Sequence, residues 1–226
     1  TLLALAAGLG LAGPANAQTT TIDFETAGDG YTPSITDGSG TTDVFNRTDD
    51  ALGGKTSDFY WAVEDLAVTD PSISLDTIDI TGKTSFEFSI DFLTPNTEDW
   101  DTTDEFLISY TIDGGTAQNL MWVQSISDGD AFNAPAALDL GFDGNGDAGE
   151  ELPALADDAS AGVGTNFDTF STSPIAVSGS NLDINLDVKN LTSADEGLYF
   201  DNITVSAVPE PSTYALLVGL FSLTLV

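Results

Sequence analysis

The sequence contains neither cysteine nor histidine. Without cysteine there is no disulfide, no thiolate nucleophile and no cysteine-based zinc site. Without histidine a Ser-His-Asp triad is excluded, and the chain lacks the side chain that most often ligates transition metals and carries protons near neutral pH. Carboxylate chemistry of the glycosidase type stays open, because it needs only a pair of acidic side chains.

Basic residues are almost as scarce, since four Lys and Arg stand against 37 Asp and Glu and the formal net charge is -33. Nucleic acids and anionic lipid surfaces are therefore poor partners, because both are bound through clustered Lys and Arg. Multivalent cations and neutral polymers are compatible with this charge. Salt screens the repulsion between surface carboxylates, so we predict that salt or Ca²⁺ raises the stability of the fold.

The first 17 residues have the pattern of a secretory signal peptide. An apolar stretch interrupted by glycine ends in Ala15-Asn16-Ala17, which matches an A-x-A cleavage site. We therefore expect an exported protein whose mature chain begins at Gln18. The sequence shows no initiator Met and no basic region before the apolar stretch, so we expect the printed chain to begin inside the signal.

The last 19 residues, 208–226, combine a proline-rich turn with an apolar run. A helix over the final 13 residues would span about 20 Å, against a bilayer core of about 30 Å. Pro209-Glu210-Pro211, a Ser/Thr spacer and the apolar run resemble the PEP-CTERM sorting signal of Gram-negative bacteria. That signal ends in a basic cluster, which the printed chain lacks, so we expect the chain to be truncated here as well.

The resemblance to PEP-CTERM proteins implies a route and a destination. It implies transient insertion of the C-terminal segment into the inner membrane, processing by an exosortase-type enzyme, and delivery to the cell surface or the extracellular space. Proteins with this signal are associated with exopolysaccharide, which makes an extracellular polysaccharide the implied partner.

Residues 18–207, between the two signals, are dominated by alternation of apolar and polar residues. The alternation is clearest at 85–92, 105–112 and 182–188, where each segment predicts a strand with one face on a core and the other in water. Weaker strand candidates are 20–25, 42–47, 58–64, 74–80, 117–124, 137–142, 166–171 and 198–206. Turn-forming Gly and Asp residues separate the segments, and no helix of ten residues is expected between the two ends. The pattern predicts an all-β fold, an antiparallel β-sandwich with jelly-roll topology, flanked by an N-terminal signal helix and a C-terminal hydrophobic helix.

A glycine-spaced acidic stretch lies at 143–151. Asp143, Asn145 and Asp147 place oxygen ligands at alternate positions, as the first half of an EF-hand loop does for Ca²⁺. Ala148 and Ala154 stand where a complete EF-hand needs Gly and Glu, so a complete EF-hand is excluded. The alternative is a solvated acidic loop, which we expect to extend over 143–164.

A second candidate metal site follows from the first and last predicted strands, which carry Asp23-Phe24-Glu25 and Tyr199-Phe200-Asp201. This arrangement is similar to that of carbohydrate-binding modules with a jelly-roll fold. By that resemblance Glu25 and Asp201 would meet at one sheet edge around a structural Ca²⁺. The alternative is a pair of separate surface carboxylates.

Trp100 lies in an acid-rich stretch, and Trp61 and Trp122 lie in predicted strands. An aromatic ring can stack on a sugar while neighbouring carboxylates accept hydrogen bonds from its hydroxyls, so the three Trp residues are candidates for ligand binding. The alternative is that they belong to the core of the sandwich.

These observations favour a non-enzymatic, exosortase-sorted protein of the cell surface or extracellular matrix, associated with exopolysaccharide. No catalytic residue is assigned. The first alternative is a carbohydrate-binding module with structural calcium, and the second is a carboxylate-based glycosidase.

Overall fold

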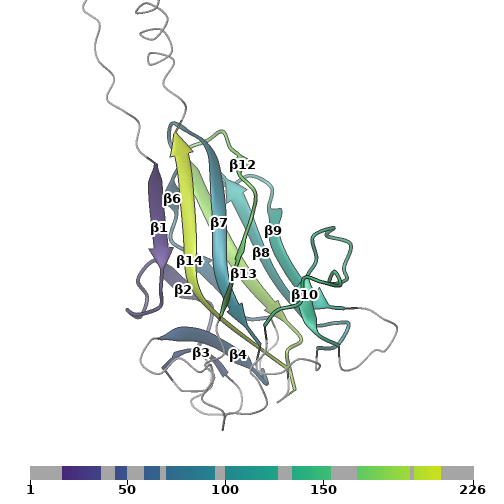
Figure 1. The fold of residues 1–226 in the computed structure, drawn as a ribbon. Coiled ribbons are helices and arrows are strands. Elements are labelled where there is room, and N and C mark those ends of the chain that lie inside the picture. The colour runs from purple at the N-terminus through teal and green to yellow at the C-terminus, as the bar shows by residue number, and fades with distance from the viewer. Residues whose placement is uncertain are drawn as a thin grey trace, which may run out of the picture.

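The computed structural model describes residues 17–36, 44–49, 59–66, 70–94, 100–126, 134–153, 167–193 and 196–209. These residues form two antiparallel sheets packed face to face, and no helix occurs among them. In Figure 1, β1, β14 and β7 belong to one layer, and β13, β8, β9 and β10 belong to the other. The all-β antiparallel sandwich expected from the sequence is thus confirmed, and the jelly-roll topology stays a prediction.

The first sheet, called sheet A, is built around two long strands. Its path is β11-β7-β14-β4-β3, with β1 also paired to β14 and β12 also paired to β7. Its strands are β1 (Gln18–Ile22), β3 (Val44–Thr48), β4 (Tyr60–Glu64), β7 (Lys83–Leu93), β11 (Asp168–Ser171), β12 (Ile175–Ala176) and β14 (Gly197–Pro209).

The second sheet, called sheet B, follows the path β10-β9-β8-β13-β5-β2, with β6 also paired to β13. Its strands are β2 (Tyr31–Pro33), β5 (Ser72–Leu75), β6 (Ile78–Asp79), β8 (Glu105–Ile112), β9 (Gln118–Ser125), β10 (Ala136–Leu138) and β13 (Asn181–Lys189).

The core lies between the sheets and is made by the apolar residues of the alternating strands. Phe88, Ile90 and Phe92 of β7 and Phe106 and Ile108 of β8 are fully buried, whereas the residues between them are exposed or half-buried. Because side chains alternate between the faces of a strand, each alternating segment has one face in the core and one face outside.

The sequence located the strands with clear alternation, including β8 at its observed bounds. It missed β2 and β12, of three and two residues, because so short a strand shows no periodicity. The predicted strand at 137–142 is wrong in its second half, since β10 ends at Leu138 and a turn-rich segment follows.

The two predicted signals lie almost entirely outside the described residues. Ala15 and both predicted terminal helices lie outside them, as do Glu210 and Pro211. Ala17 is exposed just before β1, which begins at Gln18, and Pro209 is the last residue of β14. No membrane-spanning apolar helix occurs among the described residues.

Candidate functional site

A groove with a volume of about 500 Å³ lies at one edge of the sandwich. Three segments line it: residues 119–122 of β9, the chain that follows β10, and residues 171–175, which connect β11 to β12. Its lining is mostly apolar, with a few amide, hydroxyl and carboxylate groups. Ligand-binding pockets share this size and chemistry, so we take this groove as the candidate site.

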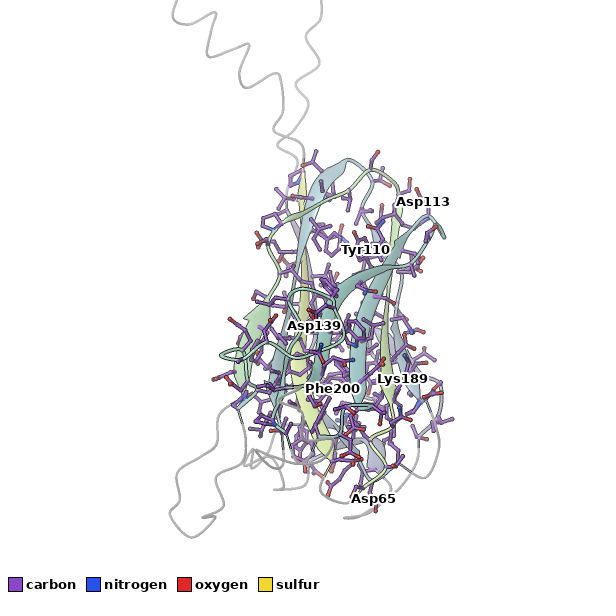
Figure 2. The ribbon with its side chains drawn as sticks, turned by 90° about the vertical axis from the view of Figure 1, so that its right-hand side faces the viewer. Asp65, Tyr110, Asp113, Asp139, Lys189 and Phe200 are labelled. Carbon is purple, nitrogen blue, oxygen red and sulfur yellow. The ribbon has the colours of Figure 1, made fainter. Side chains whose placement is uncertain are left out.

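Asp139 holds the segment after β10 in place. It is 2% exposed, and its two carboxylate oxygens accept hydrogen bonds from the backbone N–H groups of Asp143 (3.2 Å) and Gly144 (2.8 Å). Its own N–H donates to the carbonyl of Trp122 at 2.8 Å, which continues the pairing of β10 with β9. Figure 2 shows Asp139 on this segment, in front of the strands of the sheet. The buried carboxylate therefore fixes one wall of the groove.

The same segment packs directly on sheet B. A Cβ atom on Gly146 would lie 2.8 Å from the carbonyl oxygen of Gln124 and 3.0 Å from the Cβ of Ala137, so only glycine fits there. Gly144 has φ +95°, a conformation that side-chain-bearing residues rarely adopt. The glycines of 143–151, which the sequence suggested as spacers of a cation loop, thus let the loop lie against the sheet.

Trp122 contributes the largest aromatic side chain to the groove, and it is half-buried. In the amide orientation that satisfies both groups, its indole N–H donates to Gln124 at 2.7 Å, and the Gln124 amide donates to the carbonyl of Gly144 at 2.9 Å. The ring is therefore held by hydrogen bonds that link it to the loop. Trp122 thus lies at the candidate groove, and its role in ligand binding stays a prediction.

Two exposed apolar side chains complete the rim. Leu140 is 61% exposed and Phe142 is 40% exposed, and they are two of the three large hydrophobic residues exposed among the described ones. Leu140 is held in part by Asp147, whose carboxylate accepts its N–H at 2.8 Å. Exposed apolar groups gathered at a hollow are typical of a binding surface. The sequence gave no signal for them beyond the alternation that wrongly extended β10.

The other two tryptophans are core residues, so their assignment to a sugar-binding platform is wrong. Trp61 is 1% exposed and packs against Phe24, Tyr31 and Phe45. Trp100 is 2% exposed, and its indole N–H donates to the carbonyl of Gly197 at 3.2 Å. Both fill the interior because a β-sandwich of this size needs large apolar side chains between its layers.

The predicted calcium ligands of the loop bind the backbone of the same loop. Asp143 accepts the N–H of Asn145 at 3.2 Å, and Asp147 accepts the N–H of Leu140. Asp143, Asn145 and Asp147 are all exposed. Within the described ranges no group of three or more acidic side chains is arranged to hold a metal ion. Calcium binding by this loop stays a prediction.

Glu25 and Asp201 lie in different surroundings. Glu25 is exposed, its carboxylate accepts the N–H of Phe59 at 2.8 Å, and its carbonyl accepts a hydrogen bond from Arg47 at 2.5 Å. Asp201 is 2% exposed in β14 and accepts the N–H of Asn202 at 2.7 Å. The structure gathers neither into a group of three acids among the residues it describes, and their role as calcium ligands stays a prediction.

A separate pair of buried carboxyls occurs at the end of the sandwich near Trp100. Asp104 is 1% exposed and accepts the N–H of Asp101 at 2.6 Å, and Glu196 is 6% exposed and accepts the N–H groups of Thr192 and Ser193. Burial, followed by the charges of Glu196 and Asp101, raises the pKa of Asp104 to about 8. Burial also raises the pKa of Glu196 above its usual value. No signal in the sequence distinguished these two acids from the many others.

Comparison with known proteins finds no family model and no curated protein that matches the sequence. Solved structures show a distant resemblance to carbohydrate-binding modules and adhesin β-sandwich domains. One is a Clostridium thermocellum xylanase fragment complexed with xylohexaose, which contains carbohydrate-binding and catalytic modules. It has 12% identity and a TM-score of 0.44 over 84% of this chain and 28% of that one.

Two further structures are covered almost completely by the match. An adhesin domain of Lys-gingipain from Porphyromonas gingivalis has 12% identity and a TM-score of 0.38, over 83% of this chain and 97% of that one. The C-terminal family 6 carbohydrate-binding module of a marine laminarinase from Zobellia galactanivorans has 10% identity and a TM-score of 0.35, over 84% of this chain and 99% of that one. Such distant likenesses carry no information on a ligand.

Proposed function

We propose that the domain is a non-catalytic binding module for neutral carbohydrate and that the groove beside β9 and β10 is its binding site. The observation that carries this proposal is the combination of Trp122 and Phe142 with amide and hydroxyl side chains around one hollow of about 500 Å³. A sugar ring has an apolar face and a polar edge. Aromatic rings complement the face, while Asn119, Ser171 and Thr172 can donate to and accept from the hydroxyl groups.

The charge of the protein favours an uncharged ligand. The net charge is -33, and no Lys or Arg is among the groove-lining residues that the structure describes. A polyanionic polysaccharide would meet repulsion that increases at low ionic strength. Neutral glycans avoid this cost, which makes them the ligand class that the surroundings support best.

Binding without catalysis agrees with the carboxylates of the groove. Asp139 is the one acidic residue among the described residues that line it, and both of its oxygens already accept backbone N–H groups. A glycosidase uses two carboxyl groups on opposite sides of the bond that it cleaves. The groove lining supplies one, and that one supports the loop.

The cellular place of this activity is a proposal from the sequence alone. The signal peptide at 1–17 and the PEP-CTERM-like segment at 208–226 support export, exosortase processing and a location at the cell surface or in the extracellular space. A neutral exopolysaccharide of that compartment would be the ligand. Detection of the protein in a membrane-free cytoplasmic fraction of intact cells would contradict this part of the proposal.

Affinity electrophoresis through gels containing neutral polysaccharides tests the proposed function. We expect the wild-type protein to be retarded by at least one neutral glucan, mannan or xylan and not by alginate, which is anionic. Phe142→Ala should weaken retardation about tenfold, as expected when a partly exposed ring loses the contact area of a bound sugar. Val208→Ala is the matched control, because Val208 is 41% exposed and is not part of the groove. Equal retardation of the two variants, or retardation by none of the neutral polymers, would contradict the proposal.

A further inference from the structure

A second hollow, of about 440 Å³, lies on sheet B. Ser74, Thr77, Ser109, Thr111, Asp183 and Asn185 line it with hydroxyl, amide and carboxylate groups. The residues that alternate with them along the same strands, such as Ile108 beside Ser109 and Leu186 beside Asn185, are buried in the core. The hollow therefore lies on the outer face of the sheet and not between the layers.

This hollow is adjacent to the groove. Ser109, which lines the hollow, is the register partner of Asn119, which lines the groove. Register partners on antiparallel strands have side chains on the same face of the sheet, with Cβ atoms about 5 Å apart. The two hollows are therefore neighbours, with Ser109 of one beside Asn119 of the other on β8 and β9.

The Ser109–Asn119 pair belongs to a row of register partners that continues across the sheet. Ser109 pairs with Asn185 on β13, Asn185 pairs with Ser74 on β5, and Ser74 pairs with Thr32 on β2. Five neighbouring strands thus place small uncharged polar side chains in one line, and four strand spacings of about 4.8 Å give the line a length of roughly 19 Å. At the β9 end this line reaches the groove that contains Trp122 and Phe142.

The chemistry of the row suits a ligand that carries many hydroxyl groups. Ser and Thr hydroxyls and Asn amides can each donate and accept hydrogen bonds. Ser74 already donates to the side-chain amide oxygen of Asn185 at 2.9 Å, and Thr77 donates to the Asp183 carboxylate at 2.6 Å, so these side chains have defined orientations. A row of this kind offers many weak, similar contacts in sequence, which favours a repeating chain over a small molecule.

We infer that the groove and the second hollow form one track that binds a linear, neutral polysaccharide running across the strands of sheet B. This inference rests on the proposed function and adds the length and direction of the ligand. The aromatic groove holds one sugar unit tightly, and the polar row binds the units that follow it through hydrogen bonds to their hydroxyls.

Isothermal titration calorimetry with ladders of neutral oligosaccharides tests the length of the track. From the polysaccharide that binds in affinity electrophoresis, fragments from the disaccharide to the octasaccharide are prepared and titrated into the folded protein. We expect affinity to rise about tenfold or more between the disaccharide and the hexasaccharide and then to level off, since each sugar unit that reaches the row adds hydrogen bonds to it. An affinity that does not change with length would overturn the extended track while leaving the groove as a binding site.

Substitutions in the row separate the two sites. The double variant Ser109→Ala/Asn185→Ala should weaken hexasaccharide binding about tenfold and leave disaccharide binding unchanged. Phe142→Ala should weaken both. Thr19→Ala/Ser206→Ala is the matched double control on the outer face of sheet A, where the two residues pair with each other and line neither hollow. If the wild-type protein binds none of the fragments, the proposed function is contradicted. If the double variant weakens the binding of short and long fragments equally, only the track is contradicted.

Discussion

Two regions of this sandwich contain the same pair of residue types and use them differently. At the groove, Trp122 is half-buried and Asp139 is buried beneath a loop. At the end of the sandwich, Trp100 is buried and Asp104 lies close to Glu196. Asp139 accepts the backbone N–H groups of Asp143 and Gly144, whereas Asp104 accepts the N–H of Asp101 and lies close to a second carboxyl. The surroundings of these residues, and not their type, thus distinguish the groove from the end of the sandwich, where two buried carboxyls repel each other when both are charged.

The largest difference should appear when each tryptophan is removed. Trp100→Ala should lower the free energy of unfolding by roughly 4 kcal/mol, the range for truncating a buried aromatic residue, and should also leave the Gly197 carbonyl without its donor. Trp122→Ala should cost much less stability, because Trp122 is only partly buried. Urea unfolding measures both. If Trp100→Ala does not fold, Trp100→Phe should be intermediate; equal costs for Trp100→Phe and Trp122→Phe would contradict the contrast.

The second prediction concerns pH and the buried pair at the end of the sandwich. The pKa of Asp104 is raised from 3.8 to about 8 by folding, so the folded state binds its proton more tightly than the unfolded chain does. The resulting stability is present below pH 3.8 and is lost as the pH rises towards 8. We expect the free energy of unfolding to fall by roughly 3 kcal/mol between pH 4 and pH 8. This fall is smaller than the full pKa shift implies, because water near Asp104 and relaxation of the surrounding structure reduce the effect of burial.

Asp104→Asn should remove most of this pH dependence and make the protein more stable than the wild type at pH 8. Urea unfolding at a series of pH values gives the comparison. Asp76→Asn is the control, since Asp76 is exposed in the connection between β5 and β6. A wild-type profile that stays unchanged in Asp104→Asn would show that the carboxyl pair does not cause the effect.

The smallest effect is expected at the groove. Asp139→Asn keeps one oxygen acceptor and replaces the other with an N–H₂ group, so one of the two N–H groups of Asp143 and Gly144 loses its partner. A loss of about 1–2 kcal/mol of stability is expected, together with weaker glycan binding because the loop wall shifts. Asp143→Asn retains the oxygen that accepts from Asn145 and is the matched control. Equal stability of these two variants would remove Asp139 as the support of the groove wall.

The sequence predicted the sandwich because alternation reports directly which face of a strand is buried. It could not distinguish Trp61 and Trp100 from Trp122, because the burial of a tryptophan depends on pairing between distant strands. The sequence did not predict the groove, because its position also depends on contacts that form only in the folded chain. Leu140 and Phe142 continue the alternation of β10, and only the buried Asp139, which accepts N–H groups from the following turn, ends the strand and leaves both side chains exposed.

The row of polar residues on sheet B could not be predicted from the sequence either. Asn119, Ser109 and Asn185 are ordinary outward residues of three strands, and nothing in their local sequence states the register that aligns them. A slip of one residue would move each to the opposite face. Register is fixed by the packing of the whole core, so a site composed of register partners becomes visible only in the folded chain.

The tryptophan side chains offer the most direct test of the account. The chain has three Trp residues, so a ¹⁵N-labelled sample should give three indole N–H signals in a two-dimensional NMR spectrum, and single Trp→Phe variants assign them. On titration with a neutral oligosaccharide from the retarding polysaccharide, the Trp122 signal should move while those of Trp61 and Trp100 stay in place. Movement of the Trp61 or Trp100 signal with no change at Trp122, or three unchanged signals at saturating glycan, would contradict the proposed site.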